Sequence, residues 1–198
     1  MSKKESTFLQ MLLSLLVITL ISGFSLGFVN DLTVGPKAEA KLAKKINALK
    51  LVLPTFDNNP VEALTKVTSE SVTDSIEIYP AFLKNEFVGS AIIGSTDKGF
   101  SGLVKLMVGF KPNGDIENVV VLEQKETPGL GTKMADDKFI KQFKGVNISD
   151  FKLQVKKDGG DVDALTGATI SSRAFCYATQ MAYDAFIKNS GSSIELKE

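Results

Sequence analysis

The chain has 198 residues, with 23 Lys plus Arg and 23 Asp plus Glu, so its formal net charge is zero. This balance argues against a nucleic-acid binder, which normally carries an excess of basic charge. The sequence has no His and a single Cys, which excludes histidine bases, His-containing zinc sites, disulfides and an iron–sulfur cluster within this chain. The acidic residues show no spacing suited to Ca²⁺, so we expect no metal site. The length fits one domain of ordinary size or two very small ones.

An uncharged segment near the amino terminus predicts a membrane anchor. No charged residue occurs within residues 6–30, and the apolar part covers residues 8–29. A helix of about 22 residues extends about 33 Å, which is enough to cross a hydrocarbon core of about 30 Å. Lys3 and Lys4 precede it, so the positive-inside rule places the amino terminus in the cytoplasm and the later residues beyond the inner (plasma) membrane.

A cleavable signal peptide is the alternative reading of this segment. Ser25 and Gly27 could supply the small residues of a cleavage site. The apolar stretch is longer than a usual signal core, which favours a retained anchor. Under either reading, the rest of the chain is exported.

Helical and loop segments are expected after the anchor. Pro36 stands where a helix could begin, and residues 37–50 are rich in Ala, Lys, Glu and Leu, which are good helix formers. Pro54 ends that pattern. Residues 55–74, with many Asn, Ser and Thr, are expected to form a loop with at most one short helical turn.

Short segments rich in Val, Ile and Phe predict an antiparallel meander of about four strands, at residues 76–83, 87–94, 103–110 and 116–123. Between the last two, Lys111-Pro112-Asn113-Gly114 carries the signals of a hairpin turn. A short helix near residues 139–143, a strand at 151–155 and a last helix at 171–188 are expected to follow. Strands grouped in the middle with helices at both ends predict an α+β domain.

A loop of small residues before the last helix is the most informative stretch. It runs Asp163-Ala164-Leu165-Thr166-Gly167-Ala168-Thr169-Ile170-Ser171-Ser172-Arg173. A helix amino terminus presents free backbone N–H groups and partial positive charge, which suit a phosphate. The Gly and Ala allow close backbone approach, and hydroxyl groups can add hydrogen bonds from Thr166, Thr169, Ser171 and Ser172. The same residues also fit an ordinary helix N-cap.

A second loop follows the strand that ends at Glu123. It reads Gln124-Lys125-Glu126-Thr127-Pro128-Gly129-Leu130-Gly131. Its Pro and Gly residues predict a tight, exposed turn, with Glu126 at the entrance. Taken alone, it would be a plain loop.

Together these two segments resemble the FMN-binding domain family. Thr166-Gly167-Ala168-Thr169, preceded by an Asp, is similar to that family's flavin-attachment motif, and Glu126-Thr127-Pro128-Gly129-Leu130-Gly131 is similar to the loop that lies beside the flavin ring. The resemblance implies that Thr169 is esterified to the phosphate of FMN by a Mg-dependent flavin transferase that draws the group from FAD. It implies that Asp163 is recognised during transfer. It further implies flavin contacts from Leu165, Thr166, Gly167, Ala168, Ser171, Ser172, Glu126, Thr127, Gly129, Leu130 and Gly131.

Within that family, the single anchor and the Ala-Thr-Ile-Ser-Ser-Arg run resemble the G subunits of Rnf complexes, which are ion-translocating ferredoxin:NAD oxidoreductases. This implies an electron relay with no substrate-converting site of its own, which works beside other membrane and peripheral subunits. The alternatives are the C subunit of the Na-translocating NADH:quinone reductase, another flavin-carrying respiratory protein and a cofactor-free tethered binding module. The expected layout is an anchor (1–30), a helical linker and loop region (31–75), the FMN-binding domain (76–190) and a flexible tail (191–198).

Overall fold

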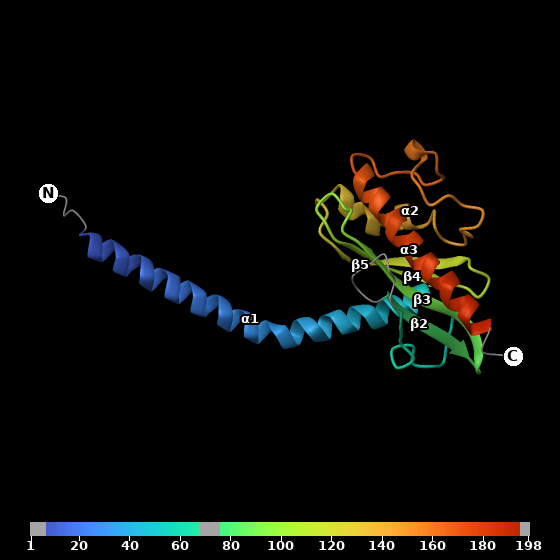
Figure 1. Cartoon of the computed structure of the whole chain (residues 1–198), viewed down its shortest axis with the longest axis horizontal. Coiled ribbons are helices and arrows are strands. Elements are labelled where there is room, and N and C mark those ends of the chain that lie inside the picture. Colours follow the sequence, from blue (N-terminus) through green and yellow to red (C-terminus); the bar gives the residue numbers. More distant parts are fainter. Residues whose placement is uncertain (1–6, 68–75, 195–198) are drawn as a thin grey trace. The chain divides into compact units, whose positions relative to one another are not determined.

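The computed structural model describes residues 7–67 and 76–194, and it begins with one long helix. This helix, α1, runs without interruption through Phe8–Val52 and contains Pro36 (Figure 1). The expectation that a separate helix begins at Pro36 is therefore wrong: α1 continues through this residue, whose ring removes one backbone N–H donor from the helix. In the described part of the chain, α1 is the one helix long and apolar enough to cross a membrane.

The chain divides into two compact units, residues 1–44 and residues 45–198. The second unit holds a five-stranded antiparallel sheet in the order β1-β2-β3-β4-β5. Its strands are β1 Thr65–Val67, β2 Ile76–Leu83, β3 Glu86–Thr96, β4 Val104–Phe110 and β5 Ile116–Gln124.

The α+β class and the four-strand meander are confirmed. The short strand β1 was not expected, and residues 68–75 of the expected loop lie outside the described residues. Lys84 and Asn85 both have positive φ, as the tight hairpin between β2 and β3 requires.

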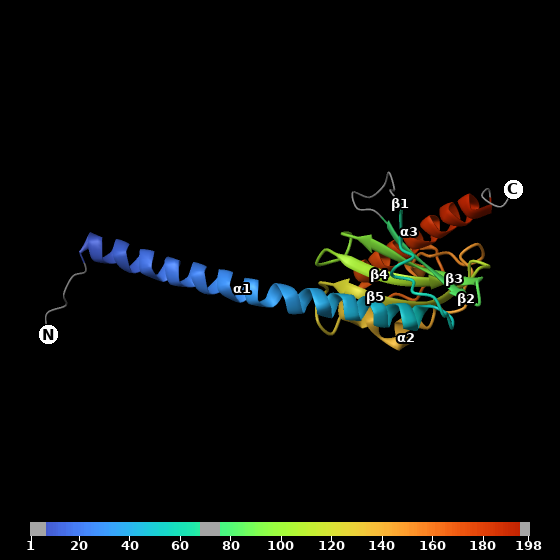
Figure 2. The ribbon, with the colours of Figure 1, turned by 90° about the horizontal axis from the view of Figure 1, so that it is seen from below.

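Helices cover both faces of the sheet. α3, Thr169–Ile194, lies across one face, and the last turns of α1 pack on the other (Figures 1 and 2). Neighbouring residues of one strand alternate between the two: in β2, Ile78 joins the core under α3, whereas Tyr79 joins the core under α1. This alternation follows from the two-residue period of a strand. The sheet is therefore buried on both sides.

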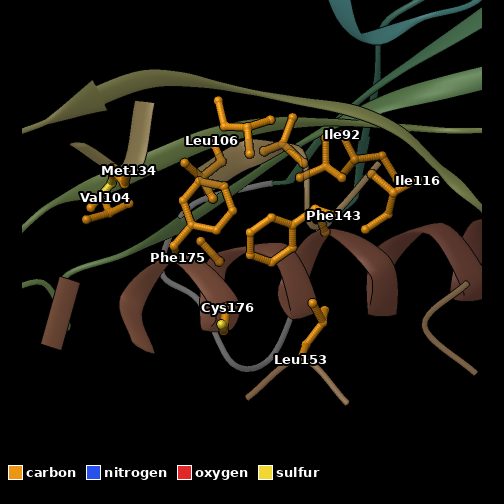
Figure 3. Packing of buried hydrophobic residues seen from close by; sticks show 14 of the residues in the cluster. Ile92, Val104, Leu106, Ile116, Met134, Phe143, Leu153, Phe175 and Cys176 are labelled. Atoms are coloured by element: carbon orange, nitrogen blue, oxygen red, sulfur yellow. The ribbon is translucent and has the colours of Figure 1, made fainter. Parts of the chain in front are cut away.

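The core under α3 is closed by aromatic rings. Phe175 of α3 contacts Phe139 and Phe143, with ring centroids 5.1 and 4.8 Å apart, respectively. Figure 3 shows Phe143 and Phe175 between α3 and the sheet, with Cys176 on the same helix. Burial raises the pKa of the Cys176 thiol to about 12, so this side chain is a packed, protonated group. These contacts fix the position of α3 and hence of its amino terminus.

Short elements connect β5 to α3: η1 Gly131–Ala135, α2 Asp137–Ile140 and η2 Lys156–Asp158. The strand expected at residues 151–155 does not form, and Val155 makes one isolated bridge to Val162. The alternating apolar pattern there arises because Leu153 and Val155 point from an irregular segment into the core. α3 continues to Ile194, into the Gly/Ser segment expected to fray.

Gly94 of β3 lets α3 approach the sheet closely. A Cβ at this position would lie 2.0 Å from the Ala178 backbone oxygen. We therefore expect Gly94→Ala to lower the free energy of unfolding by about 1–3 kcal/mol, because the helix would have to move away from the sheet. Urea denaturation of the full chain in detergent measures this loss. The control, Ser95→Ala on the same strand, should change stability by no more than about 0.5 kcal/mol, and equal stability of the two variants would contradict the prediction.

A polar cluster joins α1 to the sheet. The Lys45 ammonium lies 2.7 Å from Glu77 Oε2, and the Tyr79 hydroxyl donates to the same oxygen. Burial opposes ionisation of Glu77, but the hydrogen bonds from Lys45 and Tyr79 outweigh it and lower the pKa of the carboxyl group. Burial, followed by the hydrogen bond to Glu77, raises the pKa of Tyr79 to about 12. The cluster is thus held together by an ionised Glu77 and a protonated Tyr79.

This cluster predicts an alkaline loss of stability. Between the ordinary tyrosine pKa of 10.0 and the raised value of about 12, only the folded state keeps the Tyr79 proton. The stabilisation that the Tyr79 hydroxyl contributes is therefore complete below pH 10.0 and is lost as the pH rises towards about 12. We expect stability to fall less steeply with rising pH in Tyr79→Phe than in the chain without substitutions. Urea denaturation midpoints across this pH range measure the difference. An identical pH dependence of stability in the two proteins would contradict the role of the Tyr79 proton.

Candidate functional site

A cavity of about 340 Å³ lies where the loop after β5 meets the amino end of α3. The two sequence motifs, which are separate in the chain, both contribute to its walls. It is lined by Phe100, Glu126, Thr127, Leu130, Gly131, Gly167, Ala168, Thr169, Ile170 and Ser171. Its volume lies within the range of about 300–1,000 Å³ that is typical of small-molecule sites.

The amino end of α3 is shaped by a tight turn. The Ala168 N–H donates to the Leu165 carbonyl at 3.0 Å, and Gly167 at the third position of this turn has φ 76°. That conformation favours Gly. Ser172 Oγ accepts from the Leu165 N–H at 2.9 Å and donates to the Ala168 carbonyl at 3.0 Å. The Ser172 hydroxyl therefore holds the loop to the first turn of the helix, behind the cavity wall.

Thr169 is the first residue of α3, is half-buried and lines the cavity. The first N–H groups of an α-helix have no acceptor within the helix and attract anions. An anion bonded to the Thr169 hydroxyl would lie beside these N–H groups. The position thus combines a side-chain hydroxyl with a helix end of the kind that suits a phosphate.

Glu126 is buried inside the wall of the cavity, with 4 % of its surface exposed. Its Oε2 accepts from Ser171 Oγ at 2.6 Å, and its Oε1 accepts from the Ser101 N–H at 3.2 Å. Gly131 makes room for this arrangement, because a Cβ there would lie 2.5 Å from Ser171 Oγ. The carboxylate is therefore bound to two neighbouring segments of the site.

Several residues of the expected site lie outside the cavity wall. Asp163 is exposed: its carboxylate pairs with the Lys156 ammonium at 2.8 Å, and its backbone N–H donates to Gln142. Thr166 is exposed on the turn, and Gly129, with φ 77°, donates its N–H to the Thr132 hydroxyl at 2.9 Å. Leu165 and Ser172 are likewise absent from the lining.

Arg173, which ends the Ala-Thr-Ile-Ser-Ser-Arg run, faces another part of the domain. Its guanidinium makes two hydrogen bonds of 2.7 Å to the Asp158 carboxylate. The hydrogen bonds from Arg173 lower the pKa of Asp158 and keep it ionised. The guanidinium is therefore engaged away from the cavity.

The cavity also has an apolar rim, of which the two sequence motifs contain only a part. Phe100, Leu130 and Ile170 line the cavity while exposing 67, 44 and 45 % of their surfaces, respectively. Leu130 was expected from the second motif, whereas Phe100 and Ile170 were not assigned a role. For Phe100 the signal was an aromatic residue in a Gly-rich loop, Gly99-Phe100-Ser101-Gly102.

These features fit FMN. The helix end and the Thr169 hydroxyl suit a phosphate, the rim offers apolar surface to an aromatic ring, and glycines leave room for close approach. The pattern of the family described as FMN-binding domain matches residues 99–184, which include every residue that lines the cavity. The site and fold therefore define an FMN-binding domain that follows a long apolar helix.

Relatives that align with most of this chain identify its family within the class of FMN-binding domains. The G subunit of the ion-translocating oxidoreductase complex of Vibrio atlanticus is 32% identical over 84% of this chain and 86% of its own length. Its counterpart in Yersinia pestis is 33% identical over 78% of each chain. The G subunit of the Na(+)-translocating ferredoxin:NAD(+) oxidoreductase complex of Acetobacterium woodii is 28% identical over 88% of this chain and 89% of its own. The chain belongs to the family of ion-translocating oxidoreductase complex G subunits.

Among solved structures, NqrC of Shewanella oneidensis is similar, with 20% identity and a TM-score of 0.49 over 69% of this chain and 75% of its own.

Proposed function

We propose that this chain is the membrane-anchored electron-transfer subunit of an Rnf-type ferredoxin:NAD oxidoreductase, and that it carries FMN through a phosphoester to Thr169. The observation that supports this most strongly is the meeting of the two motifs around one cavity that contains the Thr169 side chain. Family membership supports the complex in which the protein works. When bound, FMN supplies the transfer of single electrons between neighbouring redox centres.

The attachment step in this proposal is the one that the resemblance to the FMN-binding domain family implies. The Thr169 oxygen forms a bond to the FMN phosphorus of FAD, the pyrophosphate P–O bond breaks, and AMP leaves. The hydroxyl proton passes to a base of the flavin transferase. The first N–H groups of α3 stabilise the negative charge of the resulting diester.

Asp163 contributes to recognition by the transferase in this proposal. Its side chain is 74 % exposed and lies outside the cavity wall, so another protein can contact it without disturbing the residues that line the cavity. The Lys156 pair and the Gln142 contacts hold it in a defined position beside the attachment loop.

The electron-relay role assigns no substrate-converting site to this chain. The residues of the cavity hold the flavin, exclude water from part of it and leave the rim open to a redox partner. In this proposal the amino terminus is cytoplasmic and the flavin domain lies on the extracytoplasmic side of the membrane, an orientation supported by Lys3 and Lys4 before the anchor and the positive-inside rule. Its partners are then the other membrane and peripheral subunits of the complex.

One purification tests the function. The tagged full chain is isolated from detergent-solubilised membranes of its own cells, and a portion is precipitated with acid. We expect the precipitate to remain yellow and the native preparation to contain ferredoxin:NAD oxidoreductase subunits. A colourless precipitate with a yellow supernatant would contradict the covalent attachment, and no flavin in either fraction would support the cofactor-free binding module. Co-purifying subunits of a Na-translocating NADH:quinone reductase would support the alternative assignment to that complex.

A further inference from the structure

Phe100 presents an aromatic side chain to the cavity from a loop outside both motifs. It lies between β3 and β4, in a turn closed by the Gly99 N–H, which donates to the Gly102 carbonyl at 3.1 Å. The side chain lines the cavity, yet 67 % of its surface is exposed. A large apolar side chain so exposed is stabilised when an apolar ring covers it, and aromatic rings favour offset stacking.

The buried Glu126 carboxylate ties this loop to the attachment helix. One oxygen accepts from the backbone N–H of Ser101, the residue next to Phe100, and the other accepts from Ser171 in the first turn of α3. Gly99 leaves space for the carboxylate, because a Cβ there would lie 2.4 Å from Glu126 Oε1. Glu126 thus sets the position of Phe100 relative to Thr169, the first residue of the same helix turn.

We infer that Phe100 stacks against the flavin ring of the FMN linked to Thr169, and that Glu126 is the residue that positions Phe100 for this contact. The inference rests on the proposed function. Phe100, Leu130 and Ile170 then form an apolar seat for the ring, while the phosphate remains at the helix end. The role of Glu126 is indirect, since its two oxygens already accept from protein groups.

A tryptophan scan tests the contact, because the chain contains no Trp. A Trp ring stacked on a flavin quenches flavin emission by contact, so Phe100→Trp should lose most of its flavin fluorescence when the flavin is excited directly. The matched control is Phe87→Trp, at the opposite end of β3, where the Phe87 side chain is 42 % exposed and packs on Phe82. The control should keep the flavin fluorescence of the protein without substitutions.

The positioning role is tested in the Phe100→Trp background. Gln at position 126 can accept from the Ser101 N–H through its oxygen and donate to Ser171 Oγ through its amide. Adding Glu126→Gln should therefore preserve the quenching, whereas adding Glu126→Ala should restore much of the emission. Equal emission of the Gln and Ala variants would refute the positioning role, and Gly99→Ala, which crowds the same carboxylate, provides a second way to displace the loop.

Intact mass separates failure of this inference from failure of the proposed function. If Phe100→Trp carries the added mass of attached FMN, which is FMN less one water, and still emits as strongly as Phe87→Trp, the stacking inference is wrong and the attachment stands. If the chain without substitutions, produced with the flavin transferase, carries no added mass, the proposed function and the inference both fail.

Discussion

Thr169→Ala is expected to lose all covalently bound flavin while keeping the fold of the domain. The proposed attachment needs the hydroxyl oxygen of this one side chain, and Ala removes it. In the described part of the chain, no hydrogen bond of the domain uses that hydroxyl, and Ala is a good helix former. Flavin fluorescence on a denaturing gel, after co-expression with the transferase, measures the attachment.

Two further variants serve as controls for this result. Thr169→Ser keeps a hydroxyl and should retain part of the label, whereas Thr55→Ala changes an exposed Thr outside both motifs and the cavity lining and should retain all of it. A fluorescent Thr169→Ala band would show that another residue accepts the flavin.

Phe175→Ala should strongly destabilise the domain. The Phe175 ring is fully buried and contacts both Phe139 and Phe143. Figure 3 shows Phe175 and Phe143 between α3 and the sheet. Removing a ring from such a site costs about 3–5 kcal/mol, through lost burial and the cavity left behind. We expect urea denaturation to show this loss and flavin attachment to fall with it, because α3 carries Thr169.

The control for this variant is Ile187→Ala, also on α3, where the side chain is 49 % exposed. Surface changes of this kind usually alter stability by no more than about 0.5 kcal/mol. If Phe175→Ala were as stable as this control, the aromatic cluster would not fix the position of α3.

The sequence predicted the sheet well because its signals were local. Val- and Ile-rich segments and the Asn-Gly turn before Asp115 defined the strands, and the observed bounds differ from the expected ones by a few residues. Residues 151–155 misled the prediction because the same alternation arises when an irregular segment packs two side chains into a core. Pro36 misled it because a Pro can be accommodated inside a strong helix.

The site was predicted in part, through its two motifs. Glu126 and Thr169 line one cavity, which depends on the packing of α3 against β3, β4 and η1, the element that follows the loop after β5. The contribution of Phe100 could not be predicted, because it comes from a third loop brought close by the sheet and by a hydrogen bond from Ser101 to Glu126. The position of Ser172, whose hydroxyl fastens the turn, likewise depends on three-dimensional contacts.

The most direct test of the central claim is the intact mass of the full chain, purified after co-expression with a flavin transferase. We expect an increase equal to FMN less one water, and fragmentation that locates the increase on Thr169. An unmodified mass, or an increase on a different residue, would contradict it.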